Sequence, residues 1–165
     1  MQALCMTVCR ELDLREARPE LQDFDVTADN MNHILEDTSD LTNFGMLVEL
    51  LHRGPKIHGV ERKQFKLSDG TQGDVYRALL LAICESPPRR HFNYEEITLR
   101  VRGVCGETPP VGSSITSSLG HMANIAREHA GEGSVLEWEE EVLNIVDPYF
   151  AFYLRSSGKL AALGR

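Results

Sequence analysis

Residues 112–146 read GSSITSSLGHMANIAREHAGEGSVLEWEEEVLNIV, and this stretch decides the fold that we expect. Its first half has apolar residues at successive intervals of four, three and four, which is the spacing of one face of an α-helix. These residues are Ile115, Leu119, Met122 and Ala126. We therefore expect a helix over residues 112–129, ended by Gly131 and Gly133, with its apolar face turned toward the core.

The second half of the same stretch predicts a β-hairpin. Residues 134–138 and 142–146 are rich in β-branched and other apolar side chains, and Glu139-Glu140 between them suits a tight turn. The lone tryptophan, Trp138, falls in the first strand, where it either anchors the hairpin on the helices or marks an exposed interface. A helix followed at once by a hairpin is typical of winged helix-turn-helix domains, which present their third helix outward.

Two further helices are expected before this stretch. Asp74 can cap a strongly apolar helix over residues 75–85, which Pro87-Pro88 ends. Asn93 can cap the next helix. The two glutamates that follow it would lie near the positive N-terminal end of this helix, which also favours a helix start here. With the helix at 112–129 and the hairpin, these elements complete the order of a winged helix.

The first part of the chain is also expected to be helical. The predicted helices lie at 1–16, 28–38 and 41–53. Thr27 is the expected N-cap of the second. Ala17-Arg18-Pro19 ends the first and Gly54-Pro55 ends the third, since the residue before a proline avoids the helical region and glycine is a common C-cap. Residues 54–73 are polar and rich in glycine, so we expect a subdomain boundary there.

The expected fold class is α+β, mainly α with a small β-hairpin. A helical subdomain, residues 1–73, is followed by a winged helix-turn-helix domain, residues 74–156, and by a loosely held tail, residues 157–165.

The segment VLEWEEEVLNIVDPYFAFYLR resembles the end of the winged-helix domain in AAA-like and STAND-like P-loop ATPases of archaea and bacteria. In those proteins the wing ends in Asp-Pro and an aromatic helix follows. The matching residues are Asp147, Pro148, Phe150, Tyr153, Leu154 and Arg155. The resemblance covers residues 74–156, and residues 27–53 are similar to the helical lid that precedes this domain. The resemblance implies that this chain corresponds to the C-terminal part of such an ATPase, which consists of a helical lid and a winged helix.

The chain departs from that family in lacking the nucleotide-binding core. No G-x4-G-K-[ST] sequence occurs, and the nearest candidate, Gly70 to Asp74, has no lysine to neutralise a phosphate. Without such a loop and its metal ligands, nothing cradles a triphosphate or holds magnesium. We therefore expect a non-catalytic module without a cofactor, whose partners include a protein or an ATPase domain.

Composition and charge narrow the classes of partner and location. The formal net charge is −8, whereas a nucleic-acid binder usually carries a surplus of Lys and Arg. No run of eighteen or more apolar residues is present and residues 1–13 do not form a secretory signal, so we expect a cytoplasmic protein with no membrane partner. The four cysteines are expected to be reduced and buried.

The face of helix 112–129 opposite to its apolar residues is the first candidate binding site. Its members Ser113, Ser117, Asn124 and Arg127 are of the types that reach phosphates or base edges in a major groove. The alternative is a solvated helix face, since recognition helices usually carry several basic residues. The predicted wing beside it is acidic, with Glu137, Glu139, Glu140 and Glu141.

A second candidate site is a group of arginines in the second half of the chain: Arg89, Arg90, Arg100 and Arg102. These side chains either clamp a phosphate backbone or form ion pairs with Glu95, Glu96 and the acidic wing. The second interpretation is favoured because surface arginines commonly pair in this way.

Neither a metal site nor a catalytic site is predicted. The six histidines include no two that are three or four residues apart, and no G-x-S-x-G sequence occurs. Four aromatics within residues 149–153 cannot all point one way, so the final helix is a possible site of self-association. The sequence thus favours a winged-helix module for protein contacts, and a DNA-binding winged-helix regulator is the alternative.

Overall fold

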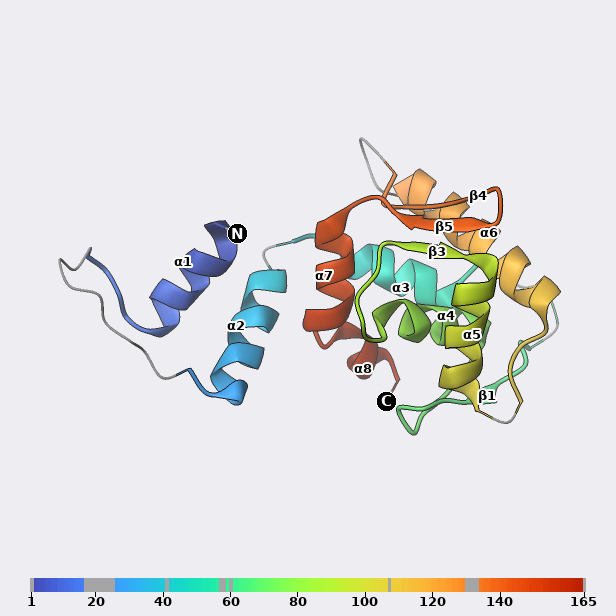
Figure 1. Ribbon diagram of the computed structural model, residues 1–165, viewed down its shortest axis with the longest axis horizontal. Helices are drawn as coiled ribbons and strands as arrows, with labels where there is room; N and C mark the ends of the chain where they lie inside the picture. The colour runs from blue at the N-terminus through green and yellow to red at the C-terminus, as the bar shows by residue number, and fades with distance from the viewer. Residues whose placement is uncertain are drawn as a thin grey trace.

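The computed structural model describes residues 2–16, 26–40, 42–56, 59, 61–106, 108–129 and 134–164. Within them the chain is mainly helical with small antiparallel sheets, as the sequence predicts (Figure 1). The elements are α1 (Gln2–Glu11), α2 (Ala28–Asp40), α3 (Gly45–Arg53), β1 (Phe65–Lys66), β2 (Gln72–Gly73), α4 (Val75–Cys84), β3 (His91–Asn93), α5 (Tyr94–Cys105), α6 (Gly112–His129), β4 (Leu136–Glu139), β5 (Val142–Ile145), α7 (Pro148–Ser156) and α8 (Lys159–Leu163).

Helix α4 is the centre of the larger part of the molecule. Its N-cap is Asp74, as predicted, and the Asp74 side chain accepts hydrogen bonds from the backbone amides of Tyr76 and Arg77. Most of its side chains are buried, and α3, α5, α6 and α7 all pack against it. This burial on nearly all sides explains why the helix has almost no polar face.

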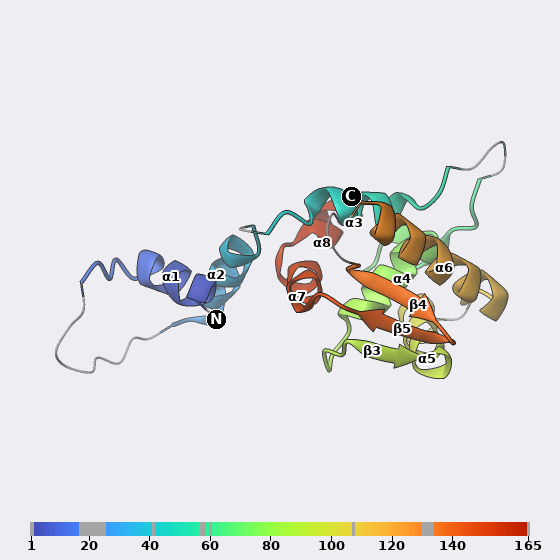
Figure 2. The same ribbon diagram turned by 90° about the horizontal axis from the view of Figure 1, so that it is seen from above.

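A three-stranded antiparallel sheet lies beside α6, in the order β3-β5-β4 (Figure 2). The expected hairpin is present as β4 and β5, with Trp138 opposite Leu143, and Trp138 packs half-buried against the core. Its turn falls at Glu140-Glu141, one residue later than predicted. Both residues have positive φ, 50° and 62°, as a two-residue hairpin turn requires. Strand β3, which the sequence did not predict, pairs with β5.

The segment that looked like a linker, residues 54–73, contains a second small hairpin. Phe65 and Lys66 pair with Gly73 and Gln72. A Cβ atom on Gly73 would lie 2.4 Å from Cδ of Arg77, so this strand can approach α4 only with a glycine at this position.

One hydrophobic cluster crosses the expected subdomain boundary at residue 73. Leu47, Val48 and Leu51 of α3 belong to the same buried core as α4 and α6. The cluster also includes Leu160, which lies in the segment expected to be a loose tail. There the short helix α8 is held by Arg77, whose Nη1 donates to the Leu160 carbonyl over 2.9 Å.

The α1–α2 pair lies to one side of this core (Figure 2). The N-cap of α2 is Thr27, as predicted, because its Oγ1 accepts a hydrogen bond from the Asn30 amide. Helix α1 ends at Glu11 rather than near residue 16, and Asp13 beyond it has a φ of 49°. Ala17-Arg18-Pro19, Gly131 and Gly133, the predicted ends of two helices, lie outside the described residues.

The four cysteines, all expected to be buried, differ in their exposure. Cys5 and Cys9 are exposed on α1, contrary to prediction, since this helix buries only Thr7 among its described side chains. Cys105 is buried and Cys84 partly so, and burial raises the pKa of the Cys84 thiol to about 12.

In the described part of the chain, the helices lack the combination of length and apolar character needed to cross a bilayer.

Candidate functional site

Helix α6 has the predicted bounds and the predicted inward face. Ile115, Leu119, Met122 and Ala126 are all 0% exposed. Tyr94 of α5 lies close to the first residue of α6, because a Cβ on Gly112 would lie 2.2 Å from the Tyr94 hydroxyl. The burial of one face fixes which residues α6 turns toward solvent.

The predicted binding residues of α6 are all exposed. They are Ser113, Ser117, Asn124 and Arg127. Arg127 donates from Nη1 to Oδ1 of Asn124 over 3.4 Å, a long contact that leaves the guanidinium available to other groups. The side chains therefore share one accessible helix face, and their binding role stays a prediction.

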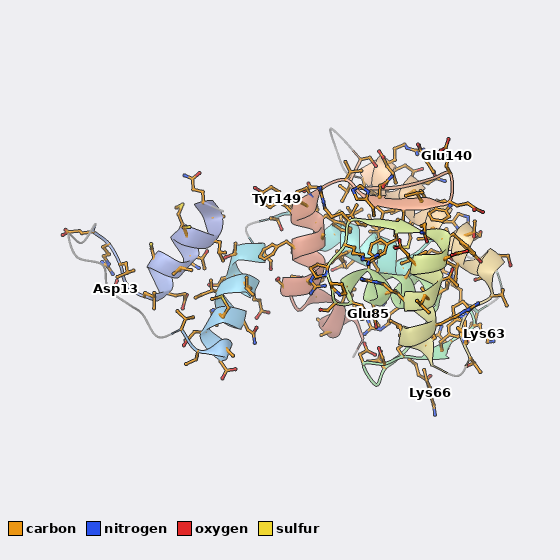
Figure 3. The ribbon with its side chains drawn as sticks, in the orientation of Figure 1. Asp13, Lys63, Lys66, Glu85, Glu140 and Tyr149 are labelled. Carbon is orange, nitrogen blue, oxygen red and sulfur yellow. The ribbon has the colours of Figure 1, made fainter. Side chains whose placement is uncertain are left out.

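The turn between β4 and β5 carries a concentrated negative charge. Glu139, Glu140 and Glu141 are consecutive and exposed. The turn stands at the edge of the molecule, where Glu140 projects outward, and β4 packs along α6 (Figure 3). A ligand lying on α6 would therefore meet a group of carboxylates beside it.

The four arginines of the second candidate site differ in their contacts. Arg89 pairs with Glu96 over 2.6 Å. Arg100 donates to the backbone carbonyls of Ala82, Glu85 and Pro87 and lies 4.9 Å from the centre of the Phe92 ring. Arg90 and Arg102 are exposed, and neither forms an ion pair within the described ranges.

Arg100 thus binds the end of α4. Its charge also acts on Glu96, because the pKa of that carboxyl is lowered by the hydrogen bond from the Asn93 amide, by Arg89 and by Arg100. Arg155, from the segment that carries the family resemblance, binds the same end by donating to the carbonyls of Cys84 and Glu85. The last carbonyls of a helix lack partners within it and carry partial negative charge, so two arginines stabilise this end. Both side chains have structural roles that their spacing in the sequence did not indicate.

A cavity of about 310 Å³ opens at the N-terminal half of α6. Most of the residues that line it were not predicted as binding residues from the sequence. Its lining includes Arg62, Lys63, Phe65, Tyr76, Ser114, Ser117, Ser118 and His121. Arg62 pairs with Asp74 over 2.8 Å and lies over the Tyr76 ring at 4.6 Å. Of the residues predicted to bind, only Ser117 reaches this cavity.

Tyr76 and His121 form a hydrogen-bonded pair at the cavity wall, with 2.9 Å between the phenol oxygen and Nδ1. Burial raises the pKa of the Tyr76 phenol above its ordinary value, so the phenol keeps its proton at neutral pH. Hydroxyl, imidazole and ammonium groups around one cavity are suited to binding an oxyanion.

A second cavity, of about 480 Å³, lies between α3, β2, α4 and α8. Arg77, which is 1% exposed, occupies its wall and binds Asp69, Thr71 and the Leu160 carbonyl. Burial alone would raise the pKa of Asp69, but hydrogen bonds from Thr71 and Arg77 lower it overall. Burial also lowers the pKa of His52, and the charge of Arg77 adds to this effect. These contacts join the β1–β2 hairpin to α8, a structural role.

No pattern in the sequence predicts the first cavity, because its residues come from three separate segments. Tyr76 and His121 are 45 positions apart. Comparison of the chain with protein-family models, curated proteins and solved structures gave no match.

Proposed function

We propose that residues 74–156 form a winged-helix binding module. The order α4-β3-α5-α6-β4-β5 and the sheet order β3-β5-β4 support this proposal (Figure 1). The exposed polar residues of α6 support it as well. In such a module the third helix and the hairpin beside it make the contact surface. Here these are α6 and the β4–β5 turn.

The partner that we propose for this surface is a protein with a basic face. The observation that carries the proposal is the charge of the surface: Glu139, Glu140 and Glu141 lie exposed beside a helix face with one arginine. Phosphates would be repelled by the three carboxylates, whereas Lys and Arg side chains of a protein would be attracted. The net charge of −8 acts in the same direction.

We further propose that the module works within an ATPase-like protein, the core of which is supplied by another domain. The resemblance at the end of the chain supports this, and the contacts there are compatible with it. Asp147 caps α7, with its Oδ1 accepting from the Tyr149 amide over 2.8 Å, and Pro148 follows it. Phe150, Tyr153 and Leu154 are buried, while Tyr149 is 58% exposed. Tyr149 is therefore the aromatic side chain through which we expect this helix to self-associate.

The test of the protein-binding proposal uses a synthetic lysine- and arginine-rich peptide as a probe. Fluorescence anisotropy should detect binding at low salt that weakens when Glu139, Glu140 and Glu141 are all replaced by Gln. A control in which Glu16, an exposed residue beyond α1, is replaced by Gln should bind like the wild-type chain. Equal binding by the triple variant and the wild-type chain would contradict the proposal.

DNA binding is the second candidate, favoured by the position of Lys63. Lys63 lines the same cavity as Ser114 and Ser117 of α6 and adds a positive charge there, whereas the charge of Arg62 is paired with Asp74. If DNA binds there, a labelled duplex at low salt should bind with a steep salt dependence, and Lys63→Ala and Arg127→Ala should weaken it. Arg15→Ala, a change at an exposed residue beyond α1, is the matched control.

A further inference from the structure

The α1–α2 pair contains a convergence of metal-ligating side chains that the sequence analysis did not find. Glu11 lies at the end of α1, and His33 and Asp37 are one turn apart on α2. One ligand atom from each of the three lies within 4.8 Å of the others. We infer that these residues form a binding site for a first-row divalent cation of the zinc class.

The distance between His33 and Asp37 fits a shared cation better than a direct contact. Nδ1 of His33 and Oδ1 of Asp37 are 3.6 Å apart, which is too long for a good hydrogen bond. Two ligands bound to one zinc ion at tetrahedral angles are about 3.4 Å apart, given bond lengths of about 2.0–2.1 Å. The two atoms therefore need to move little to bind one ion between them.

Arg10 holds Asp37 in a suitable orientation. Its Nη2 lies 2.7 Å from Oδ2, so the carboxylate is engaged at one oxygen while the other faces His33. An outer partner that fixes a ligating carboxylate is a common feature of metal sites. Asp37 is also less exposed than its neighbour, with 31% of its side chain accessible compared with 63% for His33.

The donor set indicates the class of cation. One imidazole and two carboxylates suit zinc and related ions of the first transition row. Calcium is disfavoured because it requires six to eight oxygen ligands. Three protein ligands leave the remaining position to water.

Weak apolar packing between the two helices gives such an ion a structural role. Helix α1 buries only Thr7 among its described side chains, and Met6 on it is 67% exposed. Its main contact within the described part of the chain is with α2. An ion held by Glu11, His33 and Asp37 would link α1 to α2 where little hydrophobic area does so.

The test is a calorimetric titration of the full chain with Zn²⁺. Because Cys5 and Cys9 are exposed and would also bind zinc, the titration is run on the wild-type chain and in a Cys5→Ser, Cys9→Ser background. We expect one ion per chain in that background. His33→Ala and Glu11→Gln should each weaken its binding at least tenfold, and His129→Ala, at the exposed end of α6, should leave it unchanged.

A second measurement reports the structural role. Hydrogen exchange at the amides of α1 should slow when Zn²⁺ is added to the Cys5→Ser, Cys9→Ser chain, and should not change in His33→Ala. His33 is mostly exposed, so its replacement should not disturb folding, which circular dichroism checks. The inference is overturned if no ion binds in the serine background at millimolar Zn²⁺, or if His33→Ala or Glu11→Gln retains the affinity of that background.

Discussion

The core around α4 and the α1–α2 pair are both helical, but they are held in different ways. Around α4, helices and sheet share one cluster of residues that are nearly inaccessible to solvent. Among its described residues the α1–α2 pair buries a single large apolar side chain, Ile34, together with Thr7, Thr38 and Ser39. It is also held by the packing of α2 on α7 and by polar contacts such as that between Arg10 and Asp37. Periodicity therefore predicts a helix in both regions, but the position of a helix in the fold is specified by the burial of its side chains.

The strongest test of this difference is the same substitution made in both regions. Met122→Ala, in α6, removes a side chain that is 0% exposed and should lower the free energy of unfolding by about 3 kcal/mol. Met6→Ala, in α1, removes one that is 67% exposed and should change it by less than about 0.5 kcal/mol. Urea denaturation measures both, and equal losses would remove the contrast between the regions.

The same contrast applies to charged groups. Arg77→Met leaves Asp69 without its buried partner and removes the hydrogen bond to the Leu160 carbonyl, so unfolding should become easier by about 2 kcal/mol. Arg15→Met breaks an ion pair whose side chains are 85% and 77% exposed and should have no measurable effect. Thermal denaturation of the two variants side by side would show whether burial makes the difference.

Helix α5 provides an intermediate case, because its N-terminus is exposed but fully capped. Asn93 accepts from the Glu96 amide over 2.8 Å, and the Glu96 carboxylate accepts from the Asn93 amide over 3.0 Å. Asn93→Ala should therefore cost about 1 kcal/mol of stability in urea denaturation. Asn124→Ala, an exposed change within α6, serves as control, and a similar loss there would argue against a capping effect.

The smallest expected effect concerns pH. Burial lowers the pKa of His52 in the folded chain, so the unfolded chain takes up a proton first as the pH falls. The stability contributed by neutral His52 is complete above the unfolded pKa of about 6.5 and is lost as the pH falls from there toward the folded pKa. Denaturation curves measured from pH 8 to pH 5 should show that the free energy of unfolding falls less steeply for His52→Gln than for the wild-type chain. Parallel losses would contradict this assignment.

The sequence predicted the helices of the core well because local signals and burial agree there. The bounds of α6 and the caps Asp74 and Asn93 were predicted from side-chain types alone. Strands β1, β2 and β3 were not, because two or three residues contain no periodicity. The pairing of β3 with β5 depends on a partner some fifty positions away. Such pairings are set by tertiary structure.

The candidate site was predictable only in part. The exposed residues of α6 follow from the period of its buried face, but the arginines do not show their roles in their spacing. Arg100 and Arg155 bind the carbonyls at the end of α4. The two arginines are far apart in the sequence, and only the tertiary fold brings them to this site. Likewise the pairing of Tyr76 with His121 needs the packing of α4 on α6.

We propose that the charge beside α6 selects a protein rather than DNA as partner. Titration of a labelled duplex at low salt, with the wild-type chain and with a variant in which Glu139, Glu140 and Glu141 are all replaced by Lys, tests this proposal. We predict no detectable binding by the wild-type chain and salt-sensitive binding by the variant. Binding of the wild-type chain as tight as that of the variant would contradict the claim.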